Sequence, residues 1–145
     1  MEIEEHEALC AQIREQNKQY LAIFEAELNA ANLKPKTIEK HLFNVDFYIN
    51  DYLLRYLPLE MIGGCQNEID GYLGGFFIRK VMWSTPASIK SNATSIKKFY
   101  KSMMEHGYVD KENYTDLCDD IKECMPEWLA EWESYNDFDD LADLA

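Results

Sequence analysis

The chain has 145 residues and a formal net charge of −13, with 47% hydrophobic and 13% aromatic residues. This composition is too apolar for a disordered chain, and the length suits one domain with a sizeable core. No apolar stretch approaches the roughly 20 residues that a membrane-spanning helix needs, and the acidic N-terminus differs from the basic start of a signal peptide. We therefore expect a cytoplasmic protein without membrane contact.

Apolar residues at helical spacing predict a first helix over residues 4–30. A second helix is expected over about 36–56, because Pro35 is tolerated at the first helical position. Its core stripe consists of Ile38, Leu42, Val45, Ile49 and Leu53. Phe43 and Phe47 lie on the other side, where they either pack against a neighbouring helix or form an exposed contact surface.

A third helix is expected over about 66–82. Gly71, Gly74 and Gly75 weaken it, so another helix should pack close to its backbone there. The fourth helix is expected over about 86–106, between Pro86 near its start and Gly107 as a left-handed cap.

A fifth helix is expected over about 111–124, where Pro126 interrupts it. Trp128, Leu129 and Trp132 then predict a last amphipathic turn or two that packs back on the other helices. The fold class is therefore all-α, a compact bundle of four to five helices in a single domain over residues 1–133.

Residues 134–145 form an acidic tail with apolar residues, and such termini are often mobile. The tail can be a solubilising surface or an autoinhibitory segment that lies over lysines elsewhere in the chain. In a third interpretation, Phe138, Leu141 and Leu144 anchor it in the groove of a partner protein.

The four cysteines are scattered and form no Cys-x-x-Cys pair. His6 and Cys10 share a helix face but have no further ligands beside them in the sequence. We expect reduced thiols, no metal site and no cofactor.

The negative charge is concentrated at the two ends of the chain. Residues 1–70 carry −7, residues 105–145 carry −12, and residues 71–104 contain six basic residues and no acid, for +6. At about 100° per residue, Lys90, Lys97 and Lys101 share one stripe of the fourth helix, and Lys98 lies further round.

The remaining candidate cations, Lys34, Lys36 and Lys40, gather at the start of the second helix. Several cations along one surface can neutralise phosphates of duplex DNA, although a lysine stripe can also be an ordinary solvated helix face. Three neutral residues between the lysines of the fourth helix could supply hydrogen bonds to phosphates or bases: Asn92, Thr94 and Ser95.

Two segments carry a resemblance to a known family. The segments Leu33-Lys34-Pro35-Lys36-Thr37-Ile38 and Ser95-Ile96-Lys97-Lys98-Phe99-Tyr100, the latter followed by His106-Gly107, resemble the second and fourth helices of the core-binding domain of tyrosine recombinases and phage integrases. The resemblance covers about residues 18–125. It implies a SAM-like helical fold in which these two helices straddle DNA, without the catalytic domain.

The sequence departs from the catalytic half of that family. None of the three histidines is followed by arginine or histidine three residues later, and a tyrosine without cations to stabilise the transition state is not a phosphoryl-transfer site. We therefore expect no enzymatic activity.

Three functions remain open. The first is a non-catalytic module resembling a stand-alone recombinase core-binding domain, which binds duplex DNA weakly as an accessory protein. The second is an acidic protein–protein interaction module that has lost DNA binding, with contacts through Phe43, Phe47, Trp128 and Trp132. The third is an acidic mimic of DNA that occupies the nucleic-acid site of a basic partner.

Overall fold

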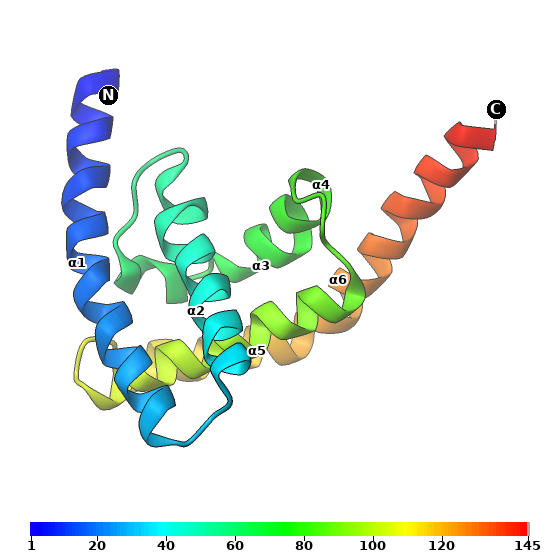
Figure 1. Ribbon diagram of the computed structural model, residues 1–145. Coiled ribbons are helices and arrows are strands. Elements are labelled where there is room, and N and C mark those ends of the chain that lie inside the picture. Colours follow the sequence, from blue (N-terminus) through cyan, green and yellow to red (C-terminus); the bar gives the residue numbers. More distant parts are fainter. Residues whose placement is uncertain (145) are drawn as a thin grey trace.

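The computed structural model describes the backbone of residues 1–144 and the side chains of residues 1–137, and all regular structure within this part is helical. Figure 1 shows the helices packed together, with α5 and α6 crossing beneath α1 and α2. In chain order the α-helices are α1 (Ile3–Ala30), α2 (Pro35–Asn50), α3 (Ile69–Gly71), α4 (Phe77–Lys80), α5 (Pro86–Glu105) and α6 (Lys111–Leu144). The expected all-α class is confirmed.

Helix α5 begins and ends at the predicted signals. The backbone N–H of Ser88 donates to Thr85 Oγ1 at 3.0 Å, and the backbone N–H of Thr85 donates to Ser88 Oγ at 2.7 Å, so two otherwise unpaired N–H groups are satisfied. Gly107 follows the helix with φ = 80°, the left-handed conformation that glycine adopts at low cost. These local contacts explain why the sequence located both ends of this helix.

Helix α2 ends six residues earlier than expected. The chain continues from Asn50 into a short 3₁₀ helix over Tyr52–Leu54, and a second one follows over Met61–Cys65. Leu53 and Leu54 are both buried, and the backbone N–H of Leu59 donates to the carbonyl of Leu53. The tighter 3₁₀ turn lets the chain reverse while both leucines enter the core.

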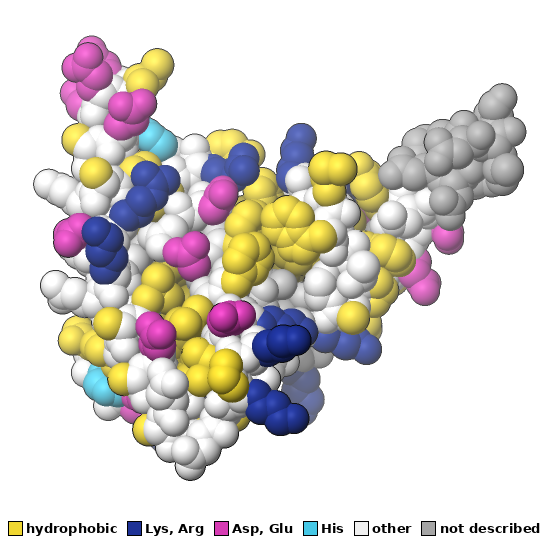
Figure 2. All heavy atoms as spheres, in the orientation of Figure 1, with side chains coloured by type: hydrophobic (Ala, Val, Ile, Leu, Met, Phe, Trp, Pro, Cys, Tyr) yellow, Lys and Arg dark blue, Asp and Glu magenta, His cyan; other side chains and the backbone are white. Residues whose placement is uncertain are grey.

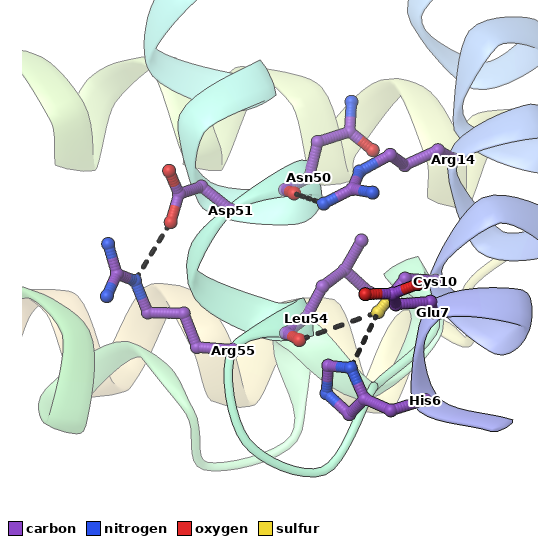
Figure 3. A pocket seen from close by; sticks show the side chains of 8 residues that line it. All are labelled: His6, Glu7, Cys10, Arg14, Asn50, Asp51, Leu54 and Arg55. Atoms are coloured by element: carbon purple, nitrogen blue, oxygen red, sulfur yellow. Dashed lines mark hydrogen bonds and ion pairs between the residues drawn. The ribbon is translucent and has the colours of Figure 1, made fainter. Parts of the chain in front are cut away.

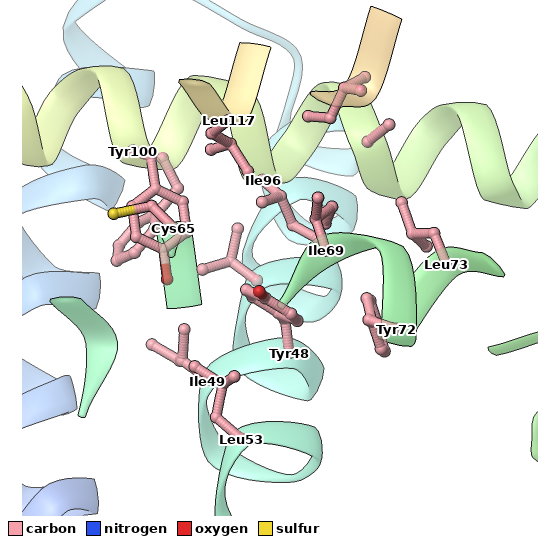
Figure 4. Close-up of a cluster of buried hydrophobic side chains, with 14 of the residues drawn as sticks. Tyr48, Ile49, Leu53, Cys65, Ile69, Tyr72, Leu73, Ile96, Tyr100 and Leu117 are labelled. Atoms are coloured by element: carbon pink, nitrogen blue, oxygen red, sulfur yellow. The ribbon is translucent and has the colours of Figure 1, made fainter. Parts of the chain in front are cut away.

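The centre of the core is a group of buried tyrosines from three elements (Figure 4). Tyr48 of α2 donates its hydroxyl hydrogen bond to the carbonyl of Gly64, and Tyr100 of α5 donates to the carbonyl of Met61 at 2.7 Å. Burial raises the pKa of both phenols well above the ordinary value. These bonds attach the Met61–Cys65 segment to both helices.

The segment expected as one helix over 66–82 is helical without a break over 69–80, although its hydrogen-bond pattern changes twice. A π-helical turn over Tyr72–Phe76 separates α3 from α4. The expected close approach of another helix is confirmed at Gly74, because a Cβ there would lie 2.6 Å from Trp128 Cδ1, but not at Gly71 or Gly75. The indole of Trp128 occupies this space, and its Nε1 donates to Asp70 Oδ1 at 2.7 Å.

The expected interruption at Pro126 is wrong. The backbone of α6 runs through Pro126 and continues over residues 134–144, which were expected to form the tail. The expected partner anchors Phe138, Leu141 and Leu144 lie outside the residues whose side chains are described. Proline inside a helix costs about 3 kcal/mol. Trp128, Leu129 and Trp132 pack against the core beyond it and compensate.

In the part of the chain that the structure describes, no helix is long and apolar enough to cross a membrane.

The contact between Gly74 and Trp128 gives a stability prediction. The substitution G74A should destabilise the protein by about 1–3 kcal/mol, because a methyl group there overlaps the indole. The matched control is G75A, since a Cβ at Gly75 meets only Arg79 Nη1 at 3.5 Å. It should leave stability unchanged or raise it by about 0.4–1 kcal/mol. Urea unfolding followed by circular dichroism compares the two variants, and equal midpoints would contradict the packing.

Candidate functional site

The lysines of α5 form an exposed stripe. Lys90, Lys97 and Lys101 lie at spacings of seven and four residues and are all exposed, as is Lys98. Figure 2 shows Lys and Arg side chains gathered over α5, below a group of hydrophobic side chains between α2 and α4. No acidic residue occurs between residues 71 and 104 to interrupt this charge.

Helix α2 contributes a second group of cations. Lys34 immediately precedes the helix. Lys36 lies in the first turn, and Lys40 lies one turn later. All three side chains are exposed. The first turn of α2 contains no acidic residue. Lysines here oppose the helix dipole, which favours negative charge at a helix N-terminus by about 0.3–1 kcal/mol. These lysines therefore do not serve the stability of α2.

A polar seam joins the two lysine-bearing helices. His41 Nδ1 of α2 lies 2.7 Å from Ser95 Oγ of α5, and Asn44 Nδ2 donates to Ser95 Oγ at 3.0 Å. Partial burial lowers the pKa of His41, and the charges of Lys98 and Lys40 lower it further. A lysine of α5 and a lysine of α2 therefore both lower the pKa of the same imidazole.

The seven candidate cations have no close carboxylate partner among the side chains that the structure describes. Among the side chains of residues 1–137, carboxylate pairs within 4.0 Å involve Lys18, Arg55, Arg79 and His106, and none of the seven. One end of the stripe does approach acids, because Lys98 and Lys101 share a hollow of about 190 Å³ with Glu27 and Glu105. We name the set the α2/α5 lysine surface: Lys34, Lys36, Lys40, Lys90, Lys97, Lys98 and Lys101.

The expected neutral hydrogen-bond donors are largely unsuited to contact a ligand. Asn92 and Ser95 are buried, and Asn92 Nδ2 donates to the carbonyl of Ser88. Thr94 is exposed, but its hydroxyl donates to the carbonyl of Lys90. The expectation for Asn92 and Ser95 is wrong because α2 covers this side of α5.

The candidate partner-binding residues separate into two groups. Trp128 is only 1% exposed, so its expected role in contact with a partner is wrong; Gly74 opens the space that buries it. Trp132 is half-buried, and its Nε1 donates to the carbonyl of Ser84 at 3.0 Å. Phe43 is 55% exposed and Phe47 is half-buried.

The structure adds an aromatic residue that sequence reasoning missed. Trp83 is 51% exposed, in the connection between α4 and α5, and its ring centroid lies 6.3 Å from that of Phe43 and 5.6 Å from that of Phe47. A signal was present, because Trp83 stands just before the Ser-Thr-Pro start of α5 and outside any predicted core stripe.

Between these rings and the start of α5 lies a groove of about 360 Å³, which we call the Trp83 groove. Lys40, Phe43 and Trp83 stand at its sides. Its other lining residues are neutral and mostly polar: Asn44, Thr85, Ala87, Ser88, Ser91 and Asn92. Lys40 belongs both to the groove and to the α2/α5 lysine surface, so the two features are continuous.

A second hollow, of about 350 Å³, lies between α1 and the end of α2 (Figure 3). Its two arginines already have partners: Arg55 Nε donates to Asp51 Oδ1 at 2.9 Å, and Arg14 Nη2 donates to the carbonyl of Asn50. His6 Nδ1 lies 3.7 Å from Cys10 Sγ, and the residues described contain no group of three ligands suited to a metal ion. This hollow offers less to a ligand than the Trp83 groove.

The chain matches no family model, no curated protein and no solved structure.

The position of His41 gives a test of the electrostatic coupling between α2 and α5. The substitution K98Q should raise the pKa of His41, because it removes a positive charge that opposes imidazole protonation. The pKa should stay below the ordinary value of 6.5, since burial is the larger cause. NMR titration of the His41 ring measures the shift, with K111Q on α6 as the control. Equal values in the two variants would contradict the coupling.

The same pKa sets the sign of a stability effect. Since protonation of His41 is disfavoured in the folded state, the unfolded chain binds the proton more tightly. The contribution of His41 to stability is therefore present above about pH 6.5 and is lost as the pH falls below it.

Proposed function

We propose that this chain is a non-catalytic nucleic-acid-binding module that contacts duplex DNA weakly through the α2/α5 lysine surface. The observation that carries the proposal is the set of seven exposed lysines, without carboxylate partners among residues 1–137, on two helices in direct contact. The two helices are those whose sequences resemble the DNA-clamping helices of the recombinase core-binding domain. The proposed role is therefore that of a stand-alone accessory module that resembles this SAM-like domain.

The net charge of −13 does not oppose this function locally. Exposed charges more than about 8 Å apart are largely screened at physiological ionic strength. All 27 acidic residues belong to residues 1–70 and 105–145, whereas residues 71–104 carry +6. Glu27 and Glu105 approach the lysine surface only at the hollow that they share with Lys98 and Lys101. Binding at the lysine surface should therefore be weak and strongly dependent on salt.

A non-catalytic role fits the environment of the nucleophilic residues. The pairing of His41 with Ser95 places a serine beside a histidine, as in nucleophilic catalysis. However, Ser95 is 0% exposed and also accepts a hydrogen bond from Asn44, so a substrate has no access to its hydroxyl. Tyr48, Tyr72 and Tyr100 are buried as well, and burial raises the pKa of each phenol.

A protein-interaction module is the second candidate, because Phe43, Met82 and Trp83 leave a large apolar area exposed. In that case a partner protein would cover the aromatic side of α2. Sedimentation velocity tests this candidate in the case where the partner is a second copy of the chain. A concentration-dependent dimer that the substitution F43A dissociates would favour a protein-interaction module over a DNA-binding module.

Salt-dependent DNA binding tests the proposal. The full chain should bind a 20-base-pair duplex at about 50 mM salt, and the slope of log K against log salt should equal about 0.9 per phosphate neutralised. The variant K90Q/K97Q/K101Q should reduce this slope by about 2–3 and weaken binding at least about tenfold. Fluorescence anisotropy measures both quantities.

The matched control is K18Q/K111Q/K122Q, which removes the same charge at exposed lysines outside the surface. It should bind like the wild type. Absence of binding by the wild-type chain at about 50 mM salt contradicts the proposal, provided that D139N/D140N/D143N, which neutralises acids of the C-terminal segment, does not bind either.

A further inference from the structure

The Trp83 groove is an aromatic site at the edge of the cationic surface. We propose that it holds an unpaired base of a single-stranded DNA segment, with the adjoining phosphates on Lys40 and the α5 lysines. This inference rests on the proposed function and names a substrate class for it: DNA that combines a duplex with a single-stranded end or gap.

The first support is the exposure of two aromatic side chains. Phe43 and Trp83 are each more than half exposed, and their ring centroids lie 6.3 Å apart. Large apolar side chains in contact with one another on a surface commonly mark a binding site, because their exposure to water is unfavourable. The group continues inward, since Phe47 lies 5.6 Å from Trp83 and 6.4 Å from Phe76 between ring centroids.

The second support is the geometry of the two outer rings. Their centroids are 6.3 Å apart and their planes meet at 56°, so they form an open wedge and not a closed stack. A base can therefore stack on one of these two rings within the groove that both of them line. Base–aromatic stacking contributes about 1–3 kcal/mol per base in proteins that bind single strands.

The third support is the chemistry of the lining. The groove contains one cation, Lys40, and no acidic residue, and it opens at the N-terminus of α5, where the helix dipole is positive. Ser91 and Thr85 add hydroxyl groups that can bond to base edges or phosphates. Positive charge with stacking rings is the usual combination in single-strand binding sites.

A second copy of the chain fits this face less well. A two-fold symmetric contact centred on the groove would bring Lys40 of both copies into one interface, where like charges disfavour association. Paired DNA fits the groove less well too, because its bases are stacked inside the helix and reach a protein pocket only after unstacking.

The experiment compares two probes, an oligothymidylate of about 15 nucleotides and a blunt duplex of equal length. The variant W83A should weaken binding of the single strand by at least about fivefold, without changing the salt slope. Its duplex affinity should remain within about twofold of the wild type. The matched control M82A, which removes a fully exposed neighbour without a ring, should bind both probes like the wild type.

Tryptophan fluorescence provides a second measurement that does not depend on a change in affinity. Trp128 is buried and Trp132 is half-buried, so Trp83 is the tryptophan that a bound base can stack upon. The single strand should quench fluorescence of the wild type and of M82A, whereas W83F should bind it with little quenching. This conservative variant keeps the test valid if W83A fails to fold.

The outcomes separate the two proposals. If the duplex binds but the single strand binds no better to wild type than to W83A, the inference about an unpaired base is wrong and the proposed function stands. If neither probe binds to the wild type or to D139N/D140N/D143N, both are wrong. If sedimentation velocity shows a wild-type dimer that W83A dissociates, a second copy covers the groove and the inference is overturned.

Discussion

Two buried hydroxyl groups constrain the arrangement of the whole protein. Tyr48 and Tyr100 come from different helices, and each must bond to a polar partner because an unpaired buried hydroxyl is costly. Both find backbone carbonyls in the segment Met61–Cys65, so α2, α5 and this connection are held in one arrangement. Gly64 permits it, since a Cβ there would overlap the Tyr100 hydroxyl and lie 2.8 Å from Leu53.

The α2/α5 lysine surface follows from that arrangement. Because α2 and α5 are fixed against each other, their separate lysine groups become one surface, and the charge of Lys98 reaches His41 across the seam. The same packing brings Phe43 beside Trp83 and forms a groove that includes Lys40. The charge and exposure of individual side chains on α2 and α5 therefore determine the properties of this surface more than the net charge of the chain does.

Prediction succeeded where the deciding interactions are local. The extents of α1 and α5 follow from regular apolar spacing and from caps such as Thr85 and Gly107, which act within one turn of the chain. Prediction failed where contacts between residues far apart in the sequence determine the local structure. Pro126 marks the end of a helix by local rules, but the burial of residues beyond it keeps α6 continuous.

The sequence by itself determined the helical class, the acid-free stretch 71–104 and the identity of the seven candidate lysines, because composition and helical periodicity are properties of the chain. Only the tertiary structure decided which residues face solvent. Trp128 enters the core because Gly74, more than fifty residues earlier, leaves room for its ring, whereas Trp83 lies in a short connection that the core does not cover. Both are tryptophans, and it is a contact distant in sequence that buries Trp128.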